Sequence, residues 1–460
     1  MTKTYIRKKL YEKYILPTEK NHGKFIGVEI EMPIVNLNRQ AVDFDVVHML
    51  TKEFCAHFGF FVTGIDDEGN TYSAEKRETG DILSYDCSYN NLELSFGREA
   101  DLNIIDSRFR RYYSFIQEFL RPHRYTMTGM GVNPYRKYNR NFPVPNGRYR
   151  MLFHHLHSFQ KYEGLMEFHP FPEFGTFSSA SQVQLDVNIE KLPQTLNVMN
   201  RLEPLKALLF SNSVLTDYDP DLLCCRDLFW EKSTHGINQK NIGMYDTEFH
   251  TADDILDYIF DTSIYCVERG DKYINFRPTN IVDYLCADTI EGEYFERGTY
   301  HRITVEPKIE DLSYLRTFKF EDLTYRGTIE YRSACTGPIR DAMALPAFHT
   351  GLSENLDALE ELLKNDDVLY GHGYTPAQLR QMLTRRTLPD FINADQLYIL
   401  LRQIVDLADD GLQKRGYNER GYLQPLYHRI ERRECPAEHM LRELENGVAL
   451  EHLIKKYAKL

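Results

Sequence analysis

Polar residues alternate with apolar residues in three separate stretches of this chain, which predicts three β-strands that each carry one polar face. The stretches are 27–31 (GVEIE), 182–188 (QVQLDVN) and 328–332 (TIEYR). Successive side chains of a strand point to opposite faces, so the acids and amides share one side while Val, Ile, Leu or Tyr take the other. The predicted polar faces carry Glu29, Glu31, Gln182, Gln184, Asp186, Asn188, Glu330 and Arg332.

The rest of the hydrophobic pattern mixes interrupted strands with long helices and shows no regular strand–helix alternation, which favours an α+β fold. Residues 24–35 and 91–96 are expected to be strands, and in the second of them Glu93 and Ser95 share a face. Residues 133–178, rich in Pro, Gly, His and aromatics, predict a long ordered loop. Helices are predicted over 45–58, 104–120, 195–215, 251–261, 342–363, 377–383, 394–412 and 437–457, with a short amphipathic helix near the N-terminus.

The polar strand faces need a compensating partner if the sheet is covered on both sides. Each desolvated carboxylate then loses several kcal/mol unless a cation, a guanidinium or hydrogen bonds compensate it. Hard divalent cations such as Mg²⁺ supply that compensation through oxygen ligands. An antiparallel sheet with one solvated face gives the same alternation without any function, and this alternative stays open for each stretch taken alone.

Composition excludes several classes of protein. The 460 residues carry a formal net charge of −13, which argues against a nucleic-acid partner and against an anionic membrane surface. The eight cysteines contain no Cys-x-x-Cys pair, so neither a zinc ribbon nor a disulfide framework is indicated. No signal peptide or transmembrane segment is predicted. A cytoplasmic protein with reduced thiols is therefore expected, while its oligomeric state cannot be inferred.

Several familiar active-site motifs are missing, including the Gly-Lys-Ser/Thr phosphate loop, Gly-x-Gly-x-x-Gly and His-Glu-x-x-His. His155 and His157 would share a strand face, but no cysteine or acid cluster accompanies them, so a transition-metal site is disfavoured. Arg226, close to the only Trp, is a candidate for binding a carboxylate or phosphate, because Arg is the preferred bidentate partner of these groups. Arg148 is a weaker candidate of the same kind. The residues alone thus predict an enzyme that uses Mg²⁺ and a phosphorylated substrate.

An ordered series of motifs resembles the glutamate–cysteine ligase family in its plant and proteobacterial branch. The resemblance extends from about Gly23 to about Leu352, and it rests on the order and spacing of the motifs rather than on any single one. The motifs are Gly27–Glu31, Leu92–Ser95, Gly147–Met151, Val183–Gln184, Leu208–Ser213, Cys225–Trp230, Ile329–Arg332 and Ala344–Phe348.

The resemblance implies a glutamine synthetase-like fold, in which a curled antiparallel sheet forms an active-site funnel surrounded by helices. Residues 1–365 would form the catalytic domain, and 366–460 a helical C-terminal extension packed on it. The implied reaction phosphorylates the γ-carboxylate of L-glutamate with ATP, after which the amine of L-cysteine attacks the γ-glutamyl phosphate. Mg²⁺ or Mn²⁺ would hold the anions in line, as phosphoryl transfer requires.

The resemblance also assigns roles to individual residues. Glu330, Arg332 and Arg226 would act in catalysis, with Arg332 steadying the transferring phosphate. Arg332, Gln184 and Arg148 would contact the nucleotide. The metal ligands implied by the resemblance are Glu29, Glu31, Asp86, Glu93, Gln184 and Glu330.

Two segments depart from the family pattern, Gly236–Met244 and Phe159–Gly175, and both lie where an acceptor amine would be recognised. A carboxylate–amine ligase of the same fold that uses another amine therefore stays open. A non-catalytic protein that senses nucleotide or amino acid is a third alternative. Against it stands the retention of Glu29, Glu31, Glu93, Glu330 and Arg332, because a degenerate site has no physical reason to keep mutually repelling carboxylates.

Overall fold

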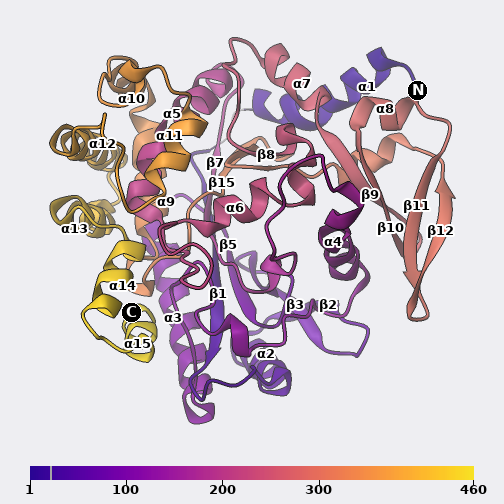
Figure 1. Cartoon of the computed structure of the whole chain (residues 1–460), viewed down its shortest axis with the longest axis horizontal. Coiled ribbons are helices and arrows are strands. Elements are labelled where there is room, and N and C mark those ends of the chain that lie inside the picture. The colour runs from indigo at the N-terminus through magenta and orange to yellow at the C-terminus, as the bar shows by residue number, and fades with distance from the viewer. Residues whose placement is uncertain (21–22) are drawn as a thin grey trace.

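A computed structural model describes residues 1–20 and 23–460, and an antiparallel sheet of nine strands lies at its centre (Figure 1). All pairings in this sheet are antiparallel, and β6 (Tyr125–Met127) pairs with the end of β1. The strand order is β14 (Glu321–Leu323), β15 (Thr328–Tyr331), β7 (Ser181–Asp186), β1 (Ile26–Asn36), β5 (Asn91–Glu99), β4 (Asp81–Tyr85), β3 (Thr71–Lys76), β2 (Phe61–Ile65).

Helices cover the apolar face of the sheet. Val28, Ile30 and Met32 of β1 are at most 1% exposed in the main hydrophobic core. The covering helices are α2 (Phe44–Phe58) beside β3, α3 (Leu102–Leu120) beside β5, and α9 (Ala344–Glu354) beside β7 and β1. The predicted helices at 45–58 and 104–120 are thereby confirmed. These helices leave the polar face on the other side of the sheet uncovered, and a binding site can form there.

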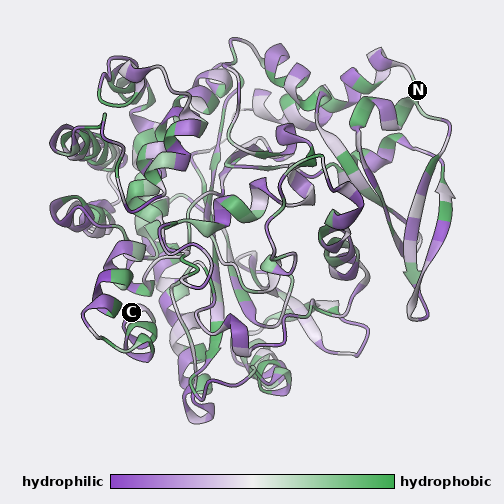
Figure 2. Ribbon diagram, in the orientation of Figure 1, coloured by the Kyte–Doolittle hydropathy of each residue, from purple (hydrophilic) through white to green (hydrophobic). Residues whose placement is uncertain are grey.

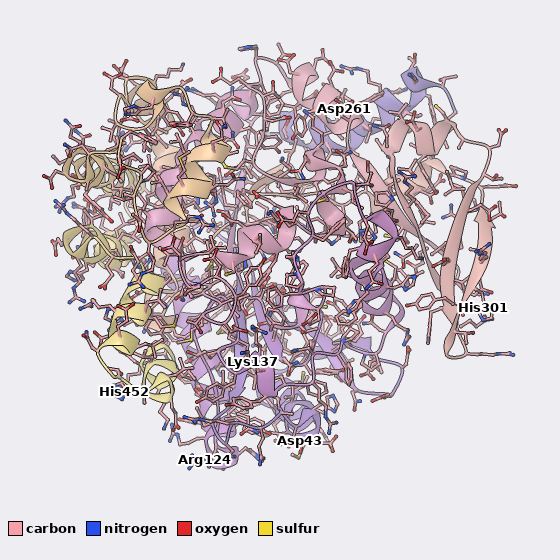
Figure 3. All side chains as sticks on the ribbon, in the orientation of Figure 1. Asp43, Arg124, Lys137, Asp261, His301 and His452 are labelled. Atoms are coloured by element: carbon pink, nitrogen blue, oxygen red, sulfur yellow. The ribbon has the colours of Figure 1, made fainter. Side chains whose placement is uncertain are left out.

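A second antiparallel sheet, which the sequence did not predict, stands beside the first. Its hairpin of β11 (Ile290–Glu296) and β12 (Thr299–Val305) projects from the body, and His301 lies on it (Figures 1 and 3). The other two strands are β9 (Ser263–Arg269) and β10 (Lys272–Asn280), in the order β12-β11-β10-β9. Near it lie α1 (Lys3–Leu10), α7 (Ala252–Phe260), α8 (Ile281–Cys286) and the short parallel pair β8 (Ile242–Gly243) and β13 (Phe318–Lys319).

The prediction of a long loop over 133–178 is wrong at its centre, where α4 (Gly147–His157) packs against β10 and β11. Asn146 caps this helix, because its side chain accepts a hydrogen bond from the backbone N–H of Tyr149. The Pro and Gly residues around this eleven-residue helix are typical of loops, and the helix was therefore not predicted. His155 and His157 consequently lie on a helix and do not share a strand face.

The C-terminal part of the chain is helical and lies along one side of the molecule (Figure 1). Hydrophilic and hydrophobic residues alternate along these helices, as one-sided packing requires (Figure 2). The predicted helices 342–363 and 437–457 are each split in two, the first at Asn355. The remaining helices are α5 (Leu192–Phe210), α6 (Cys225–Glu231), α10 (Leu356–Lys364), α11 (Pro376–Leu383), α12 (Ala394–Arg415), α13 (Gln424–Arg432), α14 (Pro436–Glu445) and α15 (Leu450–Tyr457).

The backbones of α9 and α12 touch where two glycines face each other. A Cβ atom on Gly351 would lie 2.1 Å from the carbonyl oxygen of Ala408, and one on Gly411 would lie 1.9 Å from that of Gly351. Only glycine fits such an approach. The contact fixes the C-terminal helices to the helix that covers β7 and β1, and the predicted α+β class with a helical C-terminal part is confirmed. Among the helices of the described residues, none combines the length and apolar composition that a membrane span requires.

Candidate active site

The polar face of the main sheet borders a cavity of about 700 Å³. The opposite wall comes from α4, α6, β9, β10 and the segment 313–326. Of the nine residues that the sequence analysis proposed for the site, only Gln184 is not part of the lining. The other eight are Glu29, Glu31, Asp86, Glu93, Arg148, Arg226, Glu330 and Arg332.

Strand register brings the acids together. Glu31 of β1 lies directly opposite Glu93 of β5, and Gln184 of β7 lies opposite Glu330 of β15. Residues opposite each other in an antiparallel pair carry their side chains on the same face, so the alternation within each strand becomes one continuous polar surface. The pattern of the second stretch ends at Asp186, the last residue of β7, whose carboxylate accepts from the backbone N–H of Phe25.

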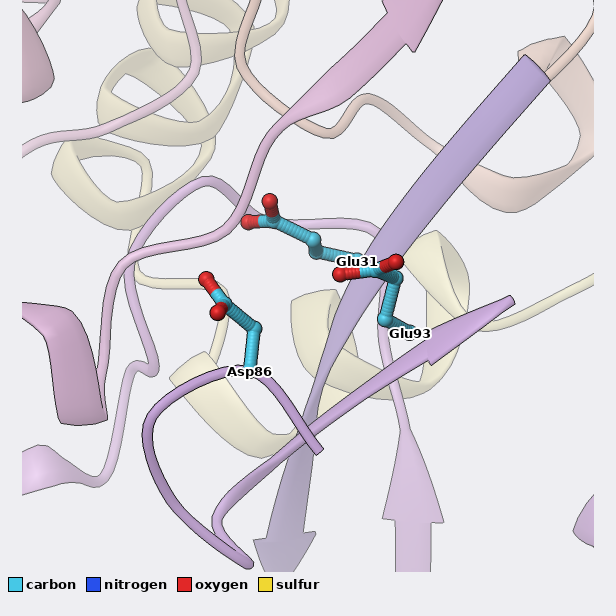
Figure 4. Close-up of side chains that lie close together, drawn as sticks. All are labelled: Glu31, Asp86 and Glu93. Atoms are coloured by element: carbon cyan, nitrogen blue, oxygen red, sulfur yellow. The ribbon is translucent and has the colours of Figure 1, made fainter. Parts of the chain in front are cut away.

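Three carboxylates converge at one end of this surface (Figure 4). Glu31, Asp86 and Glu93 each offer an oxygen, and these oxygens lie within 4.8 Å of one another. Asp86 reaches the group from the loop that follows β4. Glu31 is oriented by the backbone N–H of Ala180 at 2.6 Å and by the amide nitrogen of Gln182 at 3.0 Å. In the described part of the chain, this is the only cluster of three His, Cys, Asp or Glu ligands with metal-site spacing.

The triad is electrostatically unfavourable by itself. Burial, together with the charges of Asp86 and Glu93, raises the pKa of Glu31 to about 8. Burial and the charge of Asp86 likewise raise the pKa of Glu93 to about 7. Burial also raises the pKa of Asp86. Without a cation Glu31 and Glu93 keep part of their protons near neutral pH, because burial and like charges at this spacing disfavour ionisation of the whole group.

Oxygen donors alone make up this cluster, which fits a hard divalent cation such as Mg²⁺ or Mn²⁺ better than Zn²⁺. The histidines of α4 do not form a competing site. His154 contacts Glu293 at 3.0 Å and stacks on Tyr300, and His155 is buried against Tyr265.

A second group of charges lies beside the triad. The amide nitrogen of Gln184 donates to Glu29 at 3.1 Å and to Glu330 at 2.6 Å. Its amide oxygen, the atom that would bind a metal, accepts from Arg326 at 2.6 Å. Gln184 therefore orients two carboxylates in this structure, and its predicted contacts with metal and nucleotide remain predictions. Arg326 was missed by the sequence analysis because it sits in a turn with no periodic signal.

Arg332 follows β15 and donates a hydrogen bond to Glu330. Burial alone would lower its pKa, but the charges of Glu330, Asp322 and Glu29 together raise it above the usual value for arginine. The guanidinium is thus a permanent cation among carboxylates. It can also pair with the oxygens of a bound phosphate.

Arg226, on α6, faces the site with part of its hydrogen-bonding capacity unused. One terminal nitrogen donates to the carbonyl oxygens of Ser333 and Ala334 at 3.3 and 3.1 Å. Its Nε atom, the Ser333 hydroxyl and the Gln182 amide oxygen are buried and have no hydrogen-bond partner among the residues that the structure describes. Buried polar groups are normally paired. These three atoms in the cavity lining are therefore available to a polar ligand.

The opposite wall is aromatic. Trp230 stacks on Phe318 with ring centroids 4.6 Å apart, and His235 lies 4.4 Å from Phe318 and 5.2 Å from Tyr265. Burial lowers the pKa of His235 to about 3, and its Nε2 atom has no hydrogen-bond partner in the described part of the chain. A neutral imidazole in an aromatic wall can recognise a ligand through one hydrogen bond. No motif in the sequence marks His235, so the hydrophobic and polar pattern did not predict its place in the site.

Comparison with known proteins confirms the resemblance to glutamate–cysteine ligases. The chain is 26% identical over 336 residues to the chloroplastic glutamate–cysteine ligase of Arabidopsis thaliana, a match that covers 69% of this chain and 57% of that one. The Brassica juncea enzyme is 25% identical over 334 residues, covering 69% and 58%. The chain thus spans little more than half the length of these relatives. No family model matches it.

Similarity to solved structures is weaker. A glutamate–cysteine ligase from Francisella tularensis in complex with AMP has a TM-score of 0.46 at 11% identity, covering 95% of this chain and 88% of that one. A bifunctional glutathione synthetase from Pasteurella multocida has a TM-score of 0.43 at 12% identity, covering 100% and 53%.

Cation binding at the triad should depend on pH. Because the raised pKa values of Glu31 and Glu93 let protons compete with the metal, Mn²⁺ should bind more tightly at pH 8.5 than at pH 6 and should release protons near pH 7. Titration calorimetry in buffers of different ionisation enthalpy measures both effects. Glu31→Gln should weaken binding roughly tenfold or more, whereas Glu53→Gln on the exposed face of α2 should not. Equal affinity at both pH values would contradict a carboxylate site.

Proposed function

We propose that this protein is an ATP-dependent ligase that joins the γ-carboxylate of L-glutamate to the amine of L-cysteine, the first step of glutathione biosynthesis. The supporting observation is that carboxylates from β1, β5, β15 and the loop after β4 face one cavity that five arginines also line. The sequence relatives carry the name glutamate–cysteine ligase. The match covers little more than half the length of each relative. The activity that the relatives' names describe is therefore proposed for this protein.

The proposed chemistry has two steps. An oxygen of the glutamate γ-carboxylate attacks the γ-phosphorus of ATP, so that ADP leaves and an acyl phosphate forms. The amine nitrogen then attacks the acyl carbon, and phosphate leaves with the carboxylate oxygen. A carboxylate is a poor electrophile, and the phosphate supplies the leaving group that amide formation needs.

The residues around the cavity suit both steps. Glu31, Asp86 and Glu93 would hold a divalent cation, which when bound neutralises the phosphate oxygens. Arg332 would stabilise the charge on the transferring phosphoryl group. The free Nε of Arg226 suits a carboxylate of the amino-acid substrate. Arg148 lies close enough to Asp86 for their charges to interact, and we assign it to the nucleotide phosphates.

The aromatic wall favours a second candidate, a ligase of the same chemistry with another amine acceptor. Trp230, Phe318, Tyr265 and the neutral His235 offer flat apolar surface and one hydrogen-bonding atom. Such a surface suits a ring-bearing amine. One residue of the wall, His235, directly precedes Gly236–Met244, the segment that departs from the family pattern.

For its setting we propose a reducing cytoplasm. All eight cysteines are free thiols, including Cys224 and Cys335, whose sulfur atoms lie 3.6 Å apart. The named plant relatives are chloroplastic proteins. We propose no nucleic-acid or membrane partner, in line with the net charge of −13.

ADP release from the purified protein with ATP, Mg²⁺ and L-glutamate tests the proposal. We expect release to require an amine and to be greatest with L-cysteine, with the mass of γ-glutamylcysteine in the product. The panel of amines should include aromatic ones and a no-amine control. Release that prefers an aromatic amine would establish the second candidate. Absence of release with every amine would reject both candidates and leave a binding protein.

Replacing Arg332 by Lys should lower kcat by roughly 100-fold or more while changing the KM for glutamate much less. Lysine keeps the charge but loses the planar fork that spans two phosphate oxygens. Steady-state kinetics of ADP release measure both constants, and Arg110→Lys on the exposed side of α3 is the matched control. A rise in KM with unchanged kcat would assign Arg332 to substrate binding instead.

A further inference from the structure

The short helix α6 presents two different faces, one to the cavity and one to the C-terminal helices. Arg226 and Trp230, four residues apart, line the cavity. Asp227 and Glu231, also four residues apart, contact Arg380 and Gln381 of α11, and Asp227 borders the cavity as well. Residues at this spacing share one face of a helix. The contacts that α11 makes with Asp227 and Glu231 therefore influence the position of Arg226 and Trp230.

The helix cannot set its own position. It has seven residues, and its N-cap residue, Cys224, makes no side-chain capping bond. Helices much shorter than about 12 residues are marginal by themselves because nucleation is costly, and most of their stability comes from tertiary contacts. The contacts of α6 with the rest of the protein must therefore fix its orientation.

Arg380 makes the strongest of these contacts. Its Nε and Nη2 atoms donate to the two carboxylate oxygens of Asp227, at 2.7 and 3.1 Å, in a bidentate pair. Its Nη1 atom donates to the side chain and the backbone carbonyl of Glu203 on α5, at 2.6 and 2.9 Å. The guanidinium packs over Phe320 and is 3% exposed.

A buried bidentate pair such as Arg380–Asp227 fixes the relative orientation of the two side chains as well as their distance. Bidentate Arg–carboxylate pairs have fixed geometry, and removing one partner from a buried pair leaves an uncompensated charge. Arg380 therefore links α6 to α5, a long helix that is buried along most of its length. Gln381, the next residue, hydrogen-bonds Glu231 one turn further along α6.

We propose that Arg380 is a positioning residue for the active site: its pairing with Asp227 sets the orientation of α6 and so aims Arg226 and Trp230 into the cavity. The C-terminal part of the chain thereby supports a site whose lining residues all lie at or before residue 333. The kinetic consequence rests on the proposed function, whereas the structural consequence does not.

The chain provides a matched control. Arg429 on α13 is also a buried arginine of the C-terminal part, and it also pairs with a carboxylate, that of Asp341 at 2.8 Å. It donates to the carbonyl oxygen of Leu209 at 2.8 Å. No hydrogen bond or ion pair links it to α6 within the described residues. Arg380→Met and Arg429→Met thus each remove a buried arginine that pairs with a carboxylate and a backbone carbonyl, although Arg380 makes more hydrogen bonds, and only the first removes a contact with α6.

The single tryptophan gives a readout that does not need turnover, because Trp230 lies on α6 itself. Arg380→Met should shift its emission, increase its quenching by acrylamide and weaken the emission change that L-glutamate causes. Arg429→Met should leave all three at wild-type values even if both variants lose similar thermal stability. Kinetics should show kcat/KM for glutamate falling roughly 10- to 100-fold in Arg380→Met, because small misplacements of a binding group are costly, and less than about threefold in Arg429→Met.

Outcomes separate this proposal from the proposed function. If wild-type protein releases no ADP with any amine, the ligase assignment fails, and the Trp230 measurements still decide the role of Arg380. Unchanged Trp230 emission and quenching in Arg380→Met would overturn the proposal, as would equal kinetic losses in the two methionine variants. If Arg380→Met does not fold, Arg380→Lys and Arg429→Lys carry the same comparison, with an expected loss of roughly three- to tenfold for the first alone.

Discussion

Mutual repulsion among carboxylates gathered in one cavity is the constraint on which the rest of this structure depends. Strand register places Glu31 opposite Glu93, and Asp86 closes the group within 4.8 Å. Burial and neighbouring charge raise the pKa of Glu31 and of Glu93. A fold gains nothing in stability from such an arrangement, so it has to be held by other interactions and compensated by a ligand.

The surrounding protein supplies the holding interactions. Ala180 and Gln182 orient Glu31, and Gln184 bridges Glu29 and Glu330. The apolar side of the same strands is packed under helices, which makes the sheet a rigid support. The C-terminal helices then brace the opposite wall through α6. The cavity thus lies between a rigid sheet and a helix, α6, that the C-terminal helices hold in place. Residues distant in the sequence meet there because these two walls face each other.

Sequence patterns predicted the parts of the site that depend on local geometry. Alternation alone put Glu29 with Glu31 on one face, and the same rule applied to Glu93, Gln184 and Glu330. Alternation within one strand does not say which strands pair or in which register. The pairing of β1 with both β5 and β7 could therefore not be predicted from it. The chemistry of arginine made Arg226 and Arg148 candidates, the motif resemblance added Asp86, and the structure places all three in the cavity lining.

Other features left no readable signal. The sheet of β9 to β12 was missed because its strands mix polar and aromatic residues without a clear alternation. These strands are recognised only from their packing in the folded protein. The helix α4 was hidden among Pro and Gly, and its cap at Asn146 was not recognised. Arg380 lies outside the resembling region, and its importance follows only from its contacts with Asp227 and Glu203. The division of the chain at residue 365 stays a prediction.

Transfer of oxygen from glutamate to phosphate tests the central claim most directly. L-glutamate labelled with ¹⁸O in its γ-carboxylate is incubated with the protein, ATP, Mg²⁺ and the amine that supports ADP release, and the phosphate is analysed by mass spectrometry. The account predicts one ¹⁸O atom in each phosphate, because the leaving phosphate carries the carboxylate oxygen. Phosphate without ¹⁸O would show that ATP does not activate the carboxylate, and would contradict the role assigned to the cavity.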